Sequence, residues 1–205
     1  MTSVTDIAPV IPVVTVDDPD DAVPIARALL DGGIGIIELT LRTPTALEAL
    51  TRIARQVPDI VIGAGTVLDT ATVERAVSAG AQFLVSPGTT PTLLAAMERS
   101  GLPFLPGAAT VSEAMALLER GVTTMKFFPA VAAGGTAALA SFAGPLPQLR
   151  FCPTGGITPQ SAPGFLALAN VDCVGGSWFT PRDAVTARDW NRVTELAAQS
   201  LAMRP

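Results

Sequence analysis

Short apolar runs alternate along the whole chain with stretches in which apolar residues recur every three or four positions. The apolar runs have the length of strands and are bounded by glycine and proline, whereas the intervening stretches are rich in alanine, leucine and arginine at helical spacing. We predict strands at residues 11–16, 35–41, 60–67, 81–87, 103–109, 123–130, 149–157 and 171–178. We predict helices near residues 19–31, 43–56, 70–79, 90–100, 111–120, 133–143, 158–169 and 187–202.

Eight consecutive strand–helix units favour one architecture. Strands that are apolar almost throughout are typical of a parallel sheet covered by helices, and eight such units predict a (β/α)8 (TIM) barrel. A flavodoxin-like open sheet is the alternative, but that fold uses about five strands. No linker divides the 205 residues, which suffice for one substantial core and are few for two domains. We therefore predict an α/β fold, with a single (β/α)8 barrel domain over residues 1–205.

Composition and charge argue against several classes of partner. Apolar residues make up 49% of the chain, charged residues 15%, and the net charge is −5, so the clustered basic residues that bind nucleic acid are missing. No apolar run reaches the roughly 18 residues that cross a bilayer, and the start lacks the basic region of a signal peptide. We expect a cytoplasmic protein that binds neither nucleic acid nor a membrane, with Cys152 and Cys173 as buried structural thiols.

Two residue types that often carry chemistry are absent. The chain has no histidine and no tyrosine. A histidine-ligated metal site, a Ser-His-Asp triad and a histidine base are therefore excluded. Acid–base catalysis is left to a carboxylate, a lysine, a cysteine or water. We expect no metal and no cofactor.

The chain contains one lysine, Lys126, within the predicted strand TTMKFFPA. Because side chains alternate along a strand, Lys126 shares a face with Phe128 and can point into the barrel. The same rule sends Glu38, within the predicted strand GIIELTL, and Arg42, directly after it, toward the barrel mouth, and Thr66 joins them from the next strand. Reactive groups in such barrels lie at the carboxyl ends of the strands. We therefore expect Glu38 and Lys126 to meet in one cavity.

The expected pair has two interpretations. Buried ion pairs are common structural features, so Glu38 and Lys126 can simply neutralise one another. Arginine is the usual choice for a fixed pair, however, because it stays charged, whereas a buried lysine can become a neutral nucleophile. A desolvated amine beside a carboxylate suits Schiff-base chemistry on a carbonyl substrate. Arg42 can then hold a substrate carboxylate through two parallel hydrogen bonds.

Glycine pairs follow the last two predicted strands, in CPTGGI and VGGSW. Glycines let backbone N–H groups face an anion, and barrels frequently bind phosphate after their seventh and eighth strands. One such pair is most often a turn, but two pairs in adjacent loops favour a phosphate site.

Seven segments, in this order over almost the whole chain, resemble those of the 2-keto-3-deoxy-6-phosphogluconate (KDPG) aldolases, also described as 4-hydroxy-2-oxoglutarate (KHG) aldolases. They are IIELTLRT, IGAGTVL, GAQFLVSPG, PGAATVSEA, MKFFPA, RFCPTGGI and GGSW. The resemblance implies a metal-independent homotrimer in which Lys126 forms a Schiff base with pyruvate and Glu38 transfers protons. The implied pyruvate-binding residues are Arg42, Thr66, Pro87 and Phe128. The implied phosphate-binding residues are Thr154, Gly155, Gly156 and Ser177.

We therefore expect an aldolase of the Entner–Doudoroff pathway that cleaves KDPG to pyruvate and glyceraldehyde 3-phosphate. A second candidate substrate is 4-hydroxy-2-oxoglutarate, which yields pyruvate and glyoxylate. The alternatives are a sister aldolase for 2-dehydro-3-deoxy-6-phosphogalactonate and a non-catalytic phosphosugar-binding barrel, which would bind phosphate without forming an imine. The loop AVAAGG lacks the acidic residue that often follows FPA in the family, and PGAAT is more apolar than usual. The sequence therefore leaves the aldehyde preference open.

Overall fold

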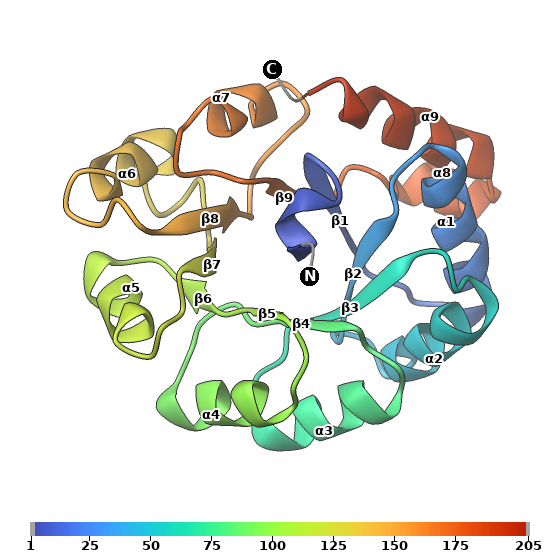
Figure 1. Cartoon of the computed structure of the whole chain (residues 1–205). Helices are drawn as coiled ribbons and strands as arrows, with labels where there is room; N and C mark the ends of the chain where they lie inside the picture. Colours follow the sequence, from blue (N-terminus) through green and yellow to red (C-terminus); the bar gives the residue numbers. More distant parts are fainter. Residues whose placement is uncertain (1–2, 204–205) are drawn as a thin grey trace.

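Parallel strands form a ring at the centre of the molecule, and helices surround it (Figure 1). The computed structural model describes residues 3–203. The strands are β1 (Val10–Val14), β2 (Ile36–Thr40), β3 (Val61–Gly65), β4 (Phe83–Val85), β5 (Phe104–Leu105), β6 (Gly107–Ala108), β7 (Thr124–Phe127), β8 (Arg150–Pro153) and β9 (Val174–Gly176). The α-helices are α1 (Pro19–Asp31), α2 (Ala46–Gln56), α3 (Thr70–Ser78), α4 (Pro91–Arg99), α5 (Val111–Leu118), α6 (Gly135–Phe142), α7 (Ala162–Leu166), α8 (Arg182–Ala187) and α9 (Trp190–Leu201).

The strand order shows how the parallel sheet curls. One sheet has the order β5-β4-β3-β2-β1-β9, and a second has the order β6-β7-β8. Two isolated parallel bridges, Phe151 with Val171 and Thr154 with Gly175, connect the two sheets beside β8 and β9. On the other side, Pro106 interrupts the predicted fifth strand and divides it into β5 and β6. Proline has no N–H to donate to a strand pair, but its carbonyl still accepts a hydrogen bond from the Lys126 N–H at 3.0 Å.

Side-chain hydrogen bonds fix where several helices begin. Asp18 accepts a hydrogen bond from the N–H of Asp20 at the start of α1 (2.9 Å). Thr110 and Glu113 form a capping box at the start of α5. The side chain of Thr110 accepts a hydrogen bond from the backbone N–H of Glu113, and the side chain of Glu113 accepts one from the backbone N–H of Thr110. Asp21 lies in the first turn of α1, and burial raises the pKa of its carboxyl group. Its Oδ1 lies 3.5 Å from Arg188 Nε. Asp18, Asp20 and Asp21 therefore all lie at the start of α1.

The end of the chain differs from the sequence prediction. The helix predicted from residue 187 begins at Trp190, where Asp189 accepts a hydrogen bond from the N–H of Arg192 (3.1 Å). A short additional helix, α8, precedes it and ends at Arg188 with a left-handed φ of 52°. The helix predicted at 158–169 is confined to Ala162–Leu166. A 3-10 helix, η1 (Val4–Asp6), was not predicted either.

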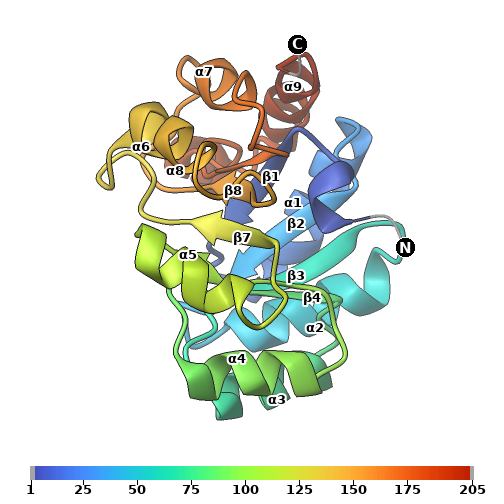
Figure 2. The same cartoon turned by 60° about the vertical axis from the view of Figure 1, so that its left-hand side comes forward.

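Aromatic packing between β7, β8 and α6 fixes the orientation of β7. The rings of Phe127, Phe142 and Phe151 contact one another edge to face, with centroids 5.6 to 6.3 Å apart. Because Phe127 is buried on this helix-facing side, its neighbour Lys126 must point to the opposite side, into the ring. Figure 2 shows the ring from the side of β7 and β8, with α5 and α6 over its outer face. Among residues 3–203, no helix is both long enough and apolar enough to cross a membrane.

Candidate active site

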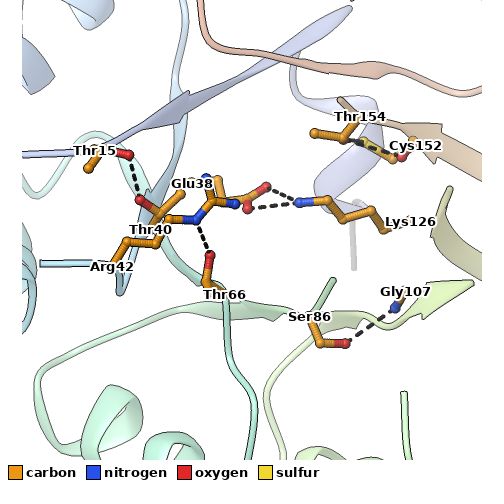
Figure 3. Close-up of polar contacts among 10 residues, drawn as sticks. All are labelled: Thr15, Glu38, Thr40, Arg42, Thr66, Ser86, Gly107, Lys126, Cys152 and Thr154. Carbon is orange, nitrogen blue, oxygen red and sulfur yellow. Dashed lines mark hydrogen bonds and ion pairs between the residues drawn. The ribbon is translucent and has the colours of Figure 1, made fainter. Parts of the chain in front are cut away.

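Glu38 on β2 and Lys126 on β7 point toward one another across the ring (Figure 3). The Lys126 Nζ donates hydrogen bonds to Glu38 Oε1 at 3.0 Å and to Oε2 at 3.3 Å. Each side chain is only 5% exposed. The predicted meeting of these two side chains is confirmed, whereas their chemical roles stay a prediction.

Room for the Glu38 carboxylate comes from glycine on the neighbouring strand. Glu38 is paired in register with Gly63, and Gly65 lies two residues further along β3, on the same face. A β-carbon on Gly65 would lie 2.3 Å from Glu38 Oε1, well inside van der Waals contact. The absence of a side chain at Gly65 therefore lets the carboxylate turn toward Lys126.

The predicted carboxylate-binding residues lie beside Glu38, just beyond the ends of β2 and β3. Arg42 is exposed and donates a hydrogen bond from Nε to Thr66 Oγ1 at 2.9 Å. Thr66 has a left-handed φ of 61°, so it ends β3 and turns its hydroxyl toward the arginine. An exposed guanidinium held in place by a hydroxyl is well suited to bind a carboxylate. Both residues therefore lie where the sequence predicted, on the same side as Glu38.

Phe128 directly follows β7, the strand of Lys126, and Pro87 follows β4. The Phe128 ring centroid lies 5.6 Å from Lys126 Nζ, which is within the range of a cation–π contact. Pro87 is partly buried, and its carbonyl lies close to Gly107. A β-carbon on Gly107 would lie only 2.4 Å from the Pro87 carbonyl oxygen. Ser86 reinforces this approach, because its Oγ accepts a hydrogen bond from the N–H of Gly107 at 3.2 Å.

The predicted phosphate-binding residues divide into two groups. Gly155 and Gly156 have φ values of 105° and 77°, in the left-handed region that favours glycine, and Gly156 is exposed, as is Ser177. Thr154 is different, since it is only 6% exposed and faces Gly175. Its hydroxyl lines the ring near Lys126 (Figure 3), whereas Gly156 and Ser177 lie in the exposed loops.

Three further residues line the site and were not predicted to do so. Thr15 shares a 2.7 Å hydrogen bond between hydroxyls with Thr40, which is fully buried on the same face of β2 as Glu38. Cys152 is buried as expected, but it is the register partner of Lys126 and lies on the face that lines the ring. The two-residue spacing from Thr154 is the signal that would have placed Cys152 there.

Acidic, cysteine and histidine side chains do not gather into a metal-binding group in the part of the chain that the structure describes. The site is instead built from one amine, one carboxylate, one guanidinium and several hydroxyls. This set of groups can form an imine, move protons and hold an anionic substrate.

The family model for KDPG and KHG aldolases matches residues 1–196 of this chain. The chain belongs to the KDPG and KHG aldolase family.

Relatives in this family match almost the whole chain. The 2-dehydro-3-deoxy-phosphogluconate aldolase of Pseudoalteromonas atlantica is 48% identical over 95% of this chain and 90% of the relative. The KHG/KDPG aldolase of Escherichia coli K12 is 47% identical over 97% of this chain and 93% of the relative. The structure of KDPG aldolase from Legionella pneumophila is 46% identical, with a TM-score of 0.94 over 96% of each chain. That family member was captured with pyruvate as a covalent carbinolamine intermediate at low pH.

Proposed function

We propose that this protein is a class I, Schiff-base aldolase that cleaves 2-dehydro-3-deoxy-6-phosphogluconate (KDPG) to pyruvate and D-glyceraldehyde 3-phosphate. The observation that carries the proposal is the buried contact between Lys126 and Glu38 at 3.0 Å. A carbinolamine is the adduct of an amine with a carbonyl carbon, so the captured pyruvate of the Legionella relative supports the same chemistry here. The name of the Escherichia coli relative supports 4-hydroxy-2-oxoglutarate as a second substrate, cleaved to pyruvate and glyoxylate.

Lys126 is the proposed nucleophile. Its Nζ must be neutral to attack the C2 carbonyl, and Glu38 is the group placed to take the proton. Addition gives a carbinolamine. Glu38 then returns its proton to the carbinolamine hydroxyl, which leaves as water, and this gives a protonated imine and restores the carboxylate. This imine withdraws electrons from C3, which prepares the C3–C4 bond for cleavage.

Glu38 is the proposed proton-transfer residue in the later steps. Its carboxylate, acting through a water molecule, takes the proton of the C4 hydroxyl as the C3–C4 bond breaks. The aldehyde leaves, and the bonding electrons form an enamine with the lysine nitrogen. Return of the proton to C3 and hydrolysis of the imine release pyruvate and restore the lysine.

The surrounding residues have proposed roles in holding the substrate. Arg42 and Thr66 bind the carboxylate next to C2, and their 2.9 Å hydrogen bond supports this because it fixes the guanidinium beside Glu38. Pro87 and Phe128 shape the pocket around the pyruvyl carbons. The phosphate is proposed to bind Thr154, Gly155, Gly156 and Ser177.

We also propose that the fold is one complete (β/α)8 barrel over residues 1–205. The strand order, together with the bridges from Phe151 to Val171 and from Thr154 to Gly175, supports a closed ring. Family membership supports a cytoplasmic homotrimer whose partners are a phosphorylated 2-keto acid and pyruvate. Light scattering of the purified protein tests the trimer.

Borohydride trapping tests the proposed chemistry. Wild-type protein is incubated with pyruvate, borohydride and excess EDTA, and one reduced pyruvyl unit is expected on the peptide that contains Lys126. Lys126→Arg is the control, since arginine keeps the positive charge but does not form the imine. A folded wild-type protein that binds phosphosugars and leaves Lys126 unmodified would instead be a non-catalytic phosphosugar-binding barrel. Comparing turnover of KDPG with turnover of its galactonate epimer then decides between the two sister aldolases.

A further inference from the structure

Thr15 directly follows β1 and continues the inward face of that strand. Val13 is the register partner of Glu38, so Thr15, two residues further along, lies on the same face as Glu38 and Thr40. The hydroxyls of Thr15 and Thr40 share a hydrogen bond of 2.7 Å (Figure 3). Thr40 is fully buried, whereas Thr15 is exposed. Thr15 therefore carries the hydroxyl of this pair that a ligand can reach.

Two further hydroxyls hold the chain beyond Thr15 in place. Thr43 Oγ1 donates a hydrogen bond to the carbonyl of Val16 at 2.7 Å, and Thr45 Oγ1 donates one to the carbonyl of Asp17 at 3.0 Å. The segment after β1 is therefore tied to the segment after β2. A hydroxyl that is held before a ligand arrives loses less conformational entropy on binding.

The hydrogen bond to Thr40 leaves Thr15 able to bind a second hydroxyl. A threonine hydroxyl has one proton to donate and two lone pairs that accept. If Thr40 donates, Thr15 keeps its proton, and if Thr15 donates, it still accepts. A hydroxyl on a substrate can donate or accept, so it fits either arrangement.

The strand order places Thr15 between two parts of the proposed site. β1 lies between β2, which carries Glu38, and β9, which Ser177 directly follows. Thr15 also borders a cavity together with Thr180, which comes after Ser177 in the chain. Open space therefore reaches from the end of β1 toward the segment after β9.

One hydroxyl of the proposed substrate has no assigned partner. Glu38 is proposed to act at the C4 hydroxyl, and Ser177 is proposed to bind the phosphate on C6. C5 joins C4 to C6, so a substrate held at both points passes the end of β1. Its C5 hydroxyl then lies beside Thr15.

We propose that Thr15 is a specificity-determining residue that binds the C5 hydroxyl of KDPG. The inference rests on the proposed aldolase function. C5 of KDPG becomes C2 of glyceraldehyde 3-phosphate, so the same contact selects aldehydes with a hydroxyl next to the carbonyl carbon. The imine forms at C2, which lies outside this contact.

The experiment compares KDPG with its 5-deoxy analogue, which keeps the carboxylate, the C4 hydroxyl and the phosphate. We expect the wild-type protein to prefer KDPG about fivefold in kcat/KM, as one hydrogen bond of ordinary strength would. Thr15→Val has the shape of threonine without the hydroxyl, and it should reduce this preference to less than twofold. Thr15→Ser keeps the hydroxyl and is the control, so it should retain the wild-type preference.

The ratio of the two substrates separates a substrate contact from a structural effect. Thr15→Val also removes the partner of Thr40, and any resulting distortion should affect both substrates alike. Equal kcat/KM values for KDPG and the 5-deoxy analogue in the wild type, a measurement that needs no variant, would overturn the inference. An unchanged preference in folded Thr15→Val would overturn it as well.

Borohydride trapping separates this inference from the proposed function. Pyruvate has no C5, so we expect it to be trapped on Lys126 at the wild-type rate in both Thr15 variants. Slower trapping in Thr15→Val than in Thr15→Ser would assign the effect of Thr15 to the amine and contradict the inference. A wild-type protein that traps no pyruvate and cleaves neither compound would overturn the proposed function together with it.

Discussion

Lys126 Nζ donates to both carboxylate oxygens of Glu38, at 3.0 and 3.3 Å, although the two residues are 88 positions apart in the chain. Each side chain is 5% exposed, so neither charge is solvated by bulk water. A buried charge without a partner is strongly unfavourable, so each of the two charged groups is stable in the interior only while the other is present. The contact is therefore both the proposed reaction centre and a determinant of stability.

Removing the lysine alone should destabilise the fold. In Lys126→Met the Glu38 carboxylate loses its partner, and we expect the free energy of unfolding to fall by about 3–5 kcal/mol in urea titrations. The double variant Lys126→Met/Glu38→Gln removes both charges and should recover most of that loss. If the double variant were as unstable as the single one, packing rather than charge would account for the effect. All Lys126 variants should be inactive.

Glu38→Gln should separate imine formation from proton transfer. Glutamine keeps the shape of glutamate but cannot take a proton, so we expect kcat for KDPG to fall about a hundredfold or more. Pyruvate should still be trapped on Lys126 by borohydride, but more slowly, because Glu38 no longer takes the proton of the amine. The deciding measurement is exchange of the pyruvate methyl protons with deuterated solvent, followed by NMR. Near-normal exchange in Glu38→Gln would assign the proton transfer to another group.

Gly65→Ala tests whether the carboxylate depends on the space that glycine leaves. The added methyl group would lie 2.3 Å from Glu38 Oε1, so the carboxylate must move away from its place beside Lys126. A displacement of about 1 Å can lower turnover up to a hundredfold, and we expect kcat to fall while the protein stays folded. Gly144→Ala is the control, since nothing lies within 4 Å of its added methyl group. Similar kinetics in the two variants would show that Glu38 tolerates the crowding.

The loss of stability on acidification should depend in part on Glu113. Its Oε2 accepts hydrogen bonds from the N–H of Ala109 at 2.8 Å and of Thr110 at 2.9 Å, and the first of these contributes most to lowering its pKa. A lowered pKa in the folded state stabilises the protein above the unfolded pKa of about 4.3, and this contribution is lost as the pH falls through the folded value.

Glu113→Gln should therefore be less stable than wild type at pH 7, by about 0.5–1 kcal/mol as for other caps. The difference in urea midpoints should shrink as the pH falls below the unfolded pKa of about 4.3, and disappear once the pH has passed the lower pKa of the folded protein. A difference that stays constant with pH would mean that the charge of Glu113 makes no contribution.

The alternation of apolar and polar residues predicted the helix and strand order, and the meeting of Glu38 with Lys126, because strand periodicity decides which side chains face inward. The division of the fifth strand could have been anticipated from Pro106, which cannot donate to a neighbouring strand. The short helix α8 could not, since its ending depends on the left-handed conformation of Arg188. The sequence also does not show that Gly65 leaves room for Glu38, or that Val131 packs on Gly156. Both depend on contacts between segments that are distant in the chain.

Gly156→Val tests whether the glycine loop binds phosphate. Gly156 has a φ of 77°, and its β-carbon would lie 2.9 Å from Val131 Cβ, so a valine must reshape the loop. If the backbone N–H groups of this loop hold the phosphate, KM for KDPG should rise strongly. KM for 4-hydroxy-2-oxoglutarate, which has no phosphate, should change much less.

Gly121→Val is the matched control for backbone strain. Gly121 has nearly the same φ, 79°, but a β-carbon there would meet no atom within 4 Å, and the residue precedes β7 at its amino end, away from the glycine loop. The control should therefore lose stability, by about 1–2 kcal/mol for a left-handed non-glycine residue, without changing the ratio of the two KM values. If Gly156→Val impaired both substrates equally while folded as well as the control, the glycines would be structural turns. The phosphate would then have to bind elsewhere at the carboxyl ends of the strands.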